Sequence, residues 1–87
     1  MTDQVQYDEM CERVVKFISD NLLAEGVHLD ADSSLTQLGL DSFSLIEMLL
    51  FVERQYGVVV PMQKFNRENT ETVRAFAEVV LSEINSQ

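Results

Sequence analysis

Apolar residues recur every three or four positions in three segments, a pattern typical of amphipathic α-helices. The first predicted helix runs from about Asp3 to Leu22 or Leu23, and its apolar stripe comprises Tyr7, Met10, Val14, Phe17 and Ile18. The last predicted helix begins near Thr70 or Thr72, either of which is a good N-cap. Its apolar stripe comprises Val73, Phe76, Ala77, Val80, Leu81 and Ile84.

The middle predicted helix extends from Asp41 or Ser42 to about Tyr56, and Gly57 suits the left-handed position after its end. Projected at about 100° per residue, its apolar side chains form two stripes. We assign one stripe to the core: Leu45, Met48, Leu49, Val52 and Tyr56. The other stripe comprises Phe43, Ile46 and Leu50, bordered by Glu47, Glu53 and Arg54. A second apolar stripe indicates either deep burial or a surface offered to a partner.

Two connections lack this periodicity. Residues 24–40 form a predicted long loop, with Leu29, Leu35 and Leu38 as its anchors in the core, and loops of this length are often functional. Residues 58–61 are predicted to be extended because Pro61 disfavours helix at the preceding residue. A short helical turn is expected within residues 62–68. The expected fold is all-α, a four-helix bundle with three longer helices, one short helix and a long first loop.

Composition and charge narrow the class of protein. A chain of 87 residues with 46% hydrophobic content predicts one folded domain, residues 1–87, with one modest core. Fifteen acidic against six basic residues give a net charge of −9. This charge argues against nucleic acid and anionic membranes as partners and favours basic protein surfaces, although it could serve solubility alone.

The single cysteine, Cys11, excludes an internal disulfide and is predicted to be a small core residue. The polar N-terminus lacks the features of a signal peptide. The longest apolar run, residues 48–52, is too short to span a bilayer. We therefore expect a cytoplasmic monomer that does not insert into membranes.

Candidate chemistry lies where the long loop meets the middle helix. Asp41 is a good N-cap, which makes Ser42 the first helical residue, with its hydroxyl directed to solvent. A serine at this position can carry a phosphate, because free backbone N–H groups and the positive end of the helix dipole face it. An Asp-Ser pair considered alone is more simply a helix cap.

Catalysis and metal binding are disfavoured. His28 is the only histidine, and Ser42 lacks the Gly-x-Ser-x-Gly elbow of a hydrolase, so we expect no enzyme and no catalytic residues. Asp30, Asp32 and Ser34 imitate the start of an EF-hand loop. Leu35 and Asp41 stand where that loop needs glycine and glutamate, so no metal site is expected.

The chain resembles the acyl carrier protein family in two runs, Leu38-Gly39-Leu40-Asp41-Ser42-Phe43 and Tyr56-Gly57-Val58-Val59-Val60-Pro61, with Glu47 between them. The resemblance covers nearly the whole chain. It implies a four-helix domain in which Ser42 carries 4′-phosphopantetheine from coenzyme A, with Asp41 as the cap beside it. It also implies that the outer face of the middle helix docks partner enzymes through Phe43, Ile46, Glu47, Leu50 and Glu53.

The implied function is a carrier that holds acyl intermediates as thioesters, since the cofactor supplies that chemistry. The implied partners are a phosphopantetheinyl transferase and acyl-transferring or acyl-modifying enzymes with basic docking surfaces. Phe43 replaces the usual leucine, and Gln37 and Ser44 stand where acids are common, which suggests a specialised lipid or polyketide-type pathway. Two alternatives stay open. One is an aminoacyl or peptidyl carrier, because residues 61–67 are similar to D-alanyl carrier proteins; the other is an unmodified acidic helical adaptor.

Overall fold

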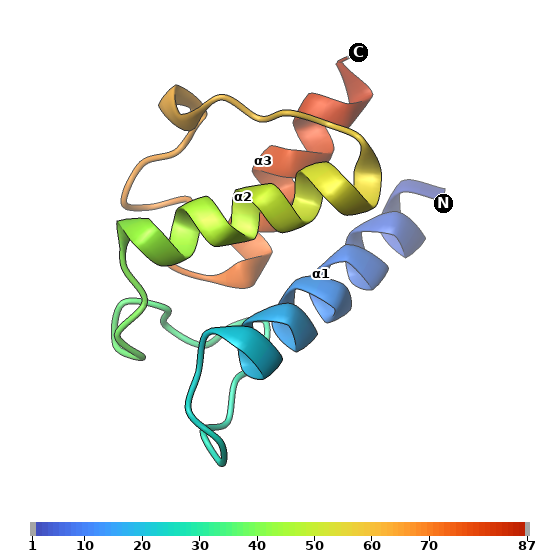
Figure 1. The fold of residues 1–87 in the computed structure, drawn as a ribbon. Helices are drawn as coiled ribbons and strands as arrows, with labels where there is room; N and C mark the ends of the chain where they lie inside the picture. Colours follow the sequence, from blue (N-terminus) through green and yellow to red (C-terminus); the bar gives the residue numbers. More distant parts are fainter. Residues whose placement is uncertain (1, 87) are drawn as a thin grey trace.

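Three α-helices and one very short helix form the regular structure. The computed structural model describes residues 2–86 and contains α1 (Thr2–Asn21), α2 (Ser42–Tyr56), the 3-10 helix η1 (Met62–Lys64) and α3 (Val73–Asn85). Figure 1 shows α2 crossing in front of α3, with α1 beside them and the long α1–α2 loop at one end. The all-helical prediction is confirmed for the described residues.

The expected short fourth helix is present only as η1, which is three residues long. Pro61 precedes it with extended backbone (φ −62°, ψ 141°), and Phe65 follows it, also extended (φ −105°, ψ 142°). Because both flanking residues are extended, the helical bonding of η1 is limited to one turn. Residues 2–86 therefore contain three α-helices and, within the residues 62–68 where a short helical turn was expected, a 3-10 turn in place of a short fourth α-helix.

The predicted helix ends agree with the structure because each depends on a local cap. Gly57 ends α2 in the left-handed conformation (φ 66°), and its N–H donates to the Glu53 carbonyl at 2.9 Å. Thr72 caps α3, and its hydroxyl accepts the N–H of Ala75 at 3.1 Å. The first helix ends at Asn21, one or two residues before the predicted end.

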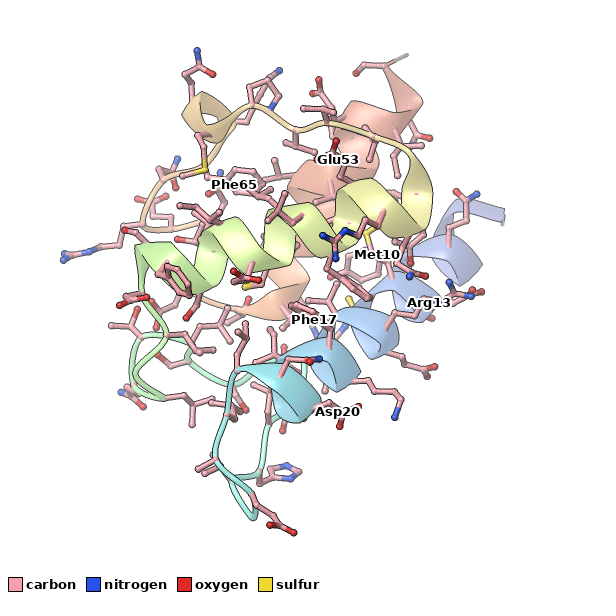
Figure 2. The ribbon with its side chains drawn as sticks, viewed as in Figure 1. Met10, Arg13, Phe17, Asp20, Glu53 and Phe65 are labelled. Carbon is pink, nitrogen blue, oxygen red and sulfur yellow. The ribbon has the colours of Figure 1, made fainter. Side chains whose placement is uncertain are left out.

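The three α-helices enclose one apolar core. Figure 2 shows Met10 and Phe17 on the side of α1 that faces α2, with Asp20 on the outer side. Arg13 Nη1 donates to Gln55 Oε1 of α2 at 3.4 Å. Nine helical side chains are at most 2% exposed: Met10, Val14, Ile18, Met48, Val52, Val73, Phe76, Ala77 and Val80. Cys11 is buried beside them, as predicted. The predicted stripes therefore identify the centre of the core.

The edge of the core differs from the prediction in detail. Leu45, Leu49 and Tyr56 are half-buried rather than central, and the fully buried stripe of α2 is limited to Ser44, Met48 and Val52. Phe51, which neither stripe included, stacks on Phe17 with the ring centroids 4.5 Å apart. This aromatic pair extends the contact between α1 and α2 beyond the predicted stripe.

The long loop between α1 and α2 is held by buried leucines and by hydrogen bonds to the start of α3. Leu29 and Leu35 are buried, and Leu38 is half-buried, so the three predicted anchors contact the core. The Leu35 N–H donates to the Glu71 carbonyl at 2.8 Å. The Arg74 N–H donates to the Ala31 carbonyl at 3.1 Å. These bonds fix the path of the loop toward the first residue of α2.

Membrane-spanning helices and metal-binding clusters were sought among the described residues. None of their helices combines the length and the apolar character that a bilayer crossing needs. Their His, Cys, Asp and Glu side chains form no group of three that could hold a metal ion.

Candidate functional site

Ser42 is the first residue of α2 and is exposed, as predicted. Asp41 precedes it with extended backbone (φ −122°, ψ −163°), the usual conformation of an N-cap residue. Its Oδ1 accepts the backbone N–H of Phe43 at 3.1 Å and of Ser44 at 3.2 Å. The cap thus holds the helix start in place and leaves the Ser42 hydroxyl at the surface.

The same cap changes one expectation about this helix start. Free backbone N–H groups were expected to face a phosphate on Ser42, but the Asp41 carboxylate occupies two of the four, those of Phe43 and Ser44. The N–H of Leu45 makes the first regular helical bond, to the Asp41 carbonyl at 3.0 Å. The N–H groups of Asp41 and Ser42 are left for an anion. The helix end therefore offers an anion two N–H groups and its dipole, with a carboxylate beside them.

Ser44 is buried, at 9% exposure, and its Oγ lies 3.5 Å from Asp41 Oδ1. Ser44 stands at a position where the family that the sequence resembles commonly has an acid, and it was therefore expected on the docking surface. In the structure its side chain lies under the cap instead. Ser44 therefore belongs to the helix start and contributes nothing to the outer face of α2.

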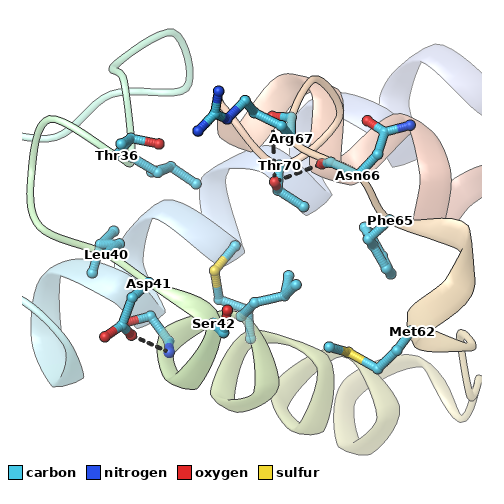
Figure 3. A pocket seen from close by; sticks show the side chains of 13 residues that line it. Thr36, Leu40, Asp41, Ser42, Met62, Phe65, Asn66, Arg67 and Thr70 are labelled. Atoms are coloured by element: carbon cyan, nitrogen blue, oxygen red, sulfur yellow. Dashed lines mark hydrogen bonds between the residues drawn. The ribbon is translucent and has the colours of Figure 1, made fainter.

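A cavity of about 460 Å³ opens beside Ser42. It lies between the start of α2, the end of the long loop and the segment that follows η1 (Figure 3). Its apolar lining comprises Leu35, Leu40, Leu45, Met48, Met62 and Phe65, and its polar lining comprises Thr36, Asp41, Ser42, Ser44, Asn66, Arg67 and Thr70. Ser42 thus lies at the wall of a space that has both apolar and hydrogen-bonding surface.

The far wall of this cavity is a turn with its own hydrogen bonds. The N–H of Asn66 donates to Asn69 Oδ1 at 2.7 Å, and the N–H of Asn69 donates to Asn66 Oδ1 at 2.9 Å. Thr70 Oγ1 donates to the Asn66 carbonyl at 2.7 Å. These bonds hold the backbone of residues 66–70 in one conformation, and Arg67 projects from it beside the cavity in Figure 3.

The outer face of α2 is exposed, so of the two possibilities left by the second apolar stripe, deep burial is excluded. Phe43 is 67% exposed, Ile46 45% and Leu50 41%. Glu53 is also exposed, whereas Glu47 is half-buried. We call Phe43, Ile46, Glu47, Leu50 and Glu53 the α2 face.

The α2 face continues onto the segment after α2. Val59 is 65% exposed and Met62 47%, while Val58 and Val60 are buried, because alternate side chains of extended backbone point in opposite directions. A notch of about 200 Å³ lies where Ile46, Leu49, Leu50 and Glu53 meet Val59, Val60 and Met62. Pro61 predicted the extended backbone of this segment, but the helical projection could not place it beside α2.

Three ionisable side chains that do not line the cavity are Glu71, Cys11 and His28. Glu71 accepts hydrogen bonds from Ser34 Oγ and, at 3.0 Å, from Thr36 Oγ1, and these bonds lower the pKa of its carboxyl. Burial raises the pKa of the Cys11 thiol, which makes it a poor nucleophile. The His28 side chain is 85% exposed, with Nε2 3.6 Å from Asp30 Oδ2.

Sequence reasoning did not connect the residues of the 62–70 segment with Ser42. Met62, Phe65, Asn66, Arg67 and Thr70 share a cavity with a serine at least 20 positions earlier in the chain. No periodic pattern relates segments that meet only after folding.

Known proteins resemble this chain in sequence and in fold. Residues 12–80 match the family model described as "Phosphopantetheine attachment site". The acyl carrier protein of Treponema pallidum (strain Nichols) is 31% identical over 88% of this chain and 97% of that protein. Aminoacyl carrier protein 2 of Bradyrhizobium diazoefficiens is 28% identical over 79% of this chain and 75% of its own length.

A solved structure shows the same fold. It is a chain in the crystal structure of the Bradyrhizobium japonicum glycine:[carrier protein] ligase complexed with its cognate carrier protein and an analogue of glycyl adenylate. The TM-score is 0.65 at 21% identity, over 87% of this chain and 96% of that one. With the family match, these findings place the chain in the acyl carrier protein family, whose phosphopantetheine attachment domain bears a covalent 4′-phosphopantetheine group and acts as a carrier, not as an enzyme.

Proposed function

We propose that Ser42 is the attachment residue and that the protein carries acyl intermediates as thioesters. The observation that supports this most directly is the position of the Ser42 hydroxyl. It is exposed at the first residue of α2 and lies at the wall of a cavity with apolar lining. A transferase can reach the hydroxyl from solvent, and the cavity offers space to whatever the serine bears.

The residues at this position fit a phosphopantetheine group. Attachment joins Ser42 Oγ to the pantetheine-bearing phosphorus of coenzyme A, breaks the diphosphate bond, and releases the adenosine bisphosphate half with a proton. When bound, the group supplies a terminal thiol that holds the cargo as a thioester. The protein itself contributes the serine, the cap that positions it, and surfaces that partners recognise.

The cavity favours an acyl chain over an aminoacyl group as cargo. Leu45, Met48, Met62 and Phe65 present apolar surface, which stabilises a hydrocarbon chain as it leaves water. An aminoacyl thioester carries an ammonium group, and burial of an unpaired charge against apolar side chains is unfavourable. The 31% identical acyl carrier protein supports the same assignment. We also propose that the carrier acts in a specialised lipid or polyketide-type pathway, because Phe43 and Gln37 depart from the common pattern of the family.

An aminoacyl carrier is the second candidate. It is supported by the relative that is named an aminoacyl carrier protein and by the fold shared with the partner of a glycine ligase. In that case the cargo would stay in solvent, outside the apolar part of the cavity. The two candidates therefore differ in whether the cargo changes the stability of the fold.

The α2 face is the proposed docking surface for the transferase and for acyl-transferring or acyl-modifying enzymes. Phe43, Ile46 and Leu50 supply exposed apolar area, and Glu47 and Glu53 supply negative charge at its border. Charge complementarity would orient a basic partner, and apolar contact would hold it. We further propose that residues 1–87 act as one monomeric carrier domain, with η1 and the turns after it in the place of the family's short helix.

Intact mass spectrometry tests the attachment. The purified protein is incubated with coenzyme A and a broad-specificity phosphopantetheinyl transferase. The parent and Ser82→Ala, which removes an exposed serine of α3, should gain one phosphopantetheine, and Ser42→Ala should gain none. Modification of Ser42→Ala would contradict the assignment, and no modification of the parent would favour the unmodified adaptor.

Thermal unfolding distinguishes the cargoes. The transferase is used to load Ser42 from octanoyl-coenzyme A in one sample and from glycyl-coenzyme A in another. An acyl carrier should show a higher Tm with the octanoyl group than with the glycyl group, because only the former buries apolar surface. Equal Tm values would contradict burial of the chain and leave the aminoacyl carrier as the better candidate.

A further inference from the structure

Two of the six basic residues make no ion pair among the described residues. The four ion pairs are Arg13–Glu9, Lys16–Asp20, Lys64–Glu83 and Arg74–Asp32. The unpaired cations are Arg54 and Arg67, both exposed. Arg54 lies in the last turn of α2, whereas Arg67 lines the cavity beside Ser42. In a chain of net charge −9, an unpaired arginine at the wall of this cavity requires an explanation.

The acidic residue that attracts Arg67 already has other partners. Glu71 lies close enough to interact with Arg67 electrostatically. However, its Oε1 accepts from Ser34 and its Oε2 accepts from Thr36. The guanidinium of Arg67 makes no hydrogen bond to another described residue, and its planar set of N–H donors matches the oxygens of a phosphate.

The start of α2 needs a cation if Ser42 bears a phosphodiester. Asp41 places a carboxylate next to Ser42, and it already takes the N–H groups of Phe43 and Ser44. A phosphodiester on Ser42 Oγ would add a second negative charge at the residue that follows this carboxylate. Like charges that lie close together repel, and a nearby cation would offset this repulsion more than the two remaining N–H groups of the helix end.

We propose that Arg67 binds the phosphodiester on Ser42 across the cavity and so directs the pantetheine arm along the 66–70 turn. The inference rests on the proposed attachment at Ser42. A guanidinium pairs with two phosphate oxygens at once, which fixes orientation as well as charge. Asn66 and Thr70 line the same wall, so the amide groups of the arm would meet polar side chains there. In the unmodified protein the Arg67 guanidinium would have no hydrogen-bond partner, and in the modified protein it would pair with the phosphodiester.

The test compares apo and modified protein by NMR, after intact mass has shown full modification of each variant. In the parent, attachment should shift the Arg67 Nε–H signal and the backbone amide signals of Asn66, Arg67 and Thr70. In Arg67→Gln these turn signals should stay at their apo positions, and only signals at the start of α2 should move. Arg54→Gln is the matched control, since it removes the other unpaired cation and should behave like the parent.

Phosphorus NMR provides a second measurement on the same samples. The phosphodiester signal should have one position in the parent and Arg54→Gln and a different position in Arg67→Gln, and high salt should reduce the difference. Arg67→Lys keeps the charge without the planar donors and should give an intermediate position. Identical turn and phosphorus signals in Arg67→Gln and Arg54→Gln would overturn the inference. Absence of modification in the parent would instead overturn the attachment at Ser42.

Discussion

Asp41 Oδ1 lies 3.5 Å from the hydroxyl oxygen of Ser44, a side chain buried beneath the start of α2. The same carboxylate oxygen accepts two backbone N–H groups. Asp41 therefore both ends the long loop and fixes the geometry of the helix on which Ser42 lies. Its negative charge is also the reason that a phosphate on the neighbouring serine needs a cation from elsewhere.

Removal of the cap should destabilise the fold moderately. Asp41→Ala leaves the N–H groups of Phe43 and Ser44 without their acceptor, so the free energy of unfolding should fall by about 0.5–2 kcal/mol. Asp41→Asn keeps an oxygen acceptor, so its free energy of unfolding should fall much less. Urea unfolding followed by circular dichroism measures both values. Equal losses in the two variants would indicate that charge, rather than hydrogen bonding, is the source of the stabilisation.

Two apolar residues of α2 should differ sharply in their contribution to stability. Met48 is 2% exposed, so Met48→Ala should cost about 2–5 kcal/mol. Ile46 is 45% exposed, and Ile46→Ala should cost about 0.5 kcal/mol or less, as for most surface substitutions. Thermal and urea unfolding of the two variants give the comparison. A similar loss in both would mean that the α2 face is part of the core in solution.

Charge on the α2 face should control the rate of docking. Glu53→Lys should slow association with a basic phosphopantetheinyl transferase by up to about tenfold at low salt and flatten its salt dependence. Glu47→Lys should act in the same direction. Glu78→Lys, the same change at an exposed position of α3, is the control and should have a smaller effect. Stopped-flow binding at two salt concentrations measures the rates. Equal effects of Glu53→Lys and Glu78→Lys would indicate that the net charge of the protein, and not the charge of the α2 face, controls the association rate.

Apolar contact on the same face should control the lifetime of the complex. Ile46→Ala should speed dissociation of the transferase by about tenfold, because a desolvated anchor at the centre of an interface contributes more than 1 kcal/mol. The association rate should change little. Val27→Ala, at an exposed residue of the long loop, is the control. An unchanged dissociation rate in Ile46→Ala would indicate that the docking surface lies elsewhere on the protein.

The link between Glu71 and the long loop should make stability depend on acid pH. The hydrogen bonds from Ser34 and Thr36 hold the folded-state pKa of Glu71 below its ordinary value of 4.5. The stabilisation is therefore complete above the unfolded-state pKa and is lost as the pH falls through the lower folded-state value. Glu71→Gln should be less stable than the parent at pH 7, and the difference should shrink in acid. Urea unfolding at pH 7 and below pH 4 measures it, with Glu68→Gln as the control. A difference that does not change with pH would exclude the carboxylate charge as its source.

Local sequence is sufficient to predict the features that depend on near neighbours. The bounds of α2 follow from a cap at Asp41 and a left-handed Gly57, and the start of α3 was narrowed to Thr70 or Thr72, of which the structure uses Thr72. The two stripes of α2 separated the exposed Ile46 from the buried Met48. All of these depend on residues within a few positions of one another, where helical periodicity and capping chemistry are sufficient.

Packing of the whole chain, and not the local sequence, determines which distant segments meet. Ser34 and Thr36 bond to Glu71, and Arg67 lines the cavity of Ser42, although each pair is at least 25 positions apart. Such pairs leave no periodic trace in the chain, since they depend on how the loops close once the core has packed. Local pattern therefore predicted where the candidate attachment serine lies, and packing of the whole chain decided which charges and surfaces surround it.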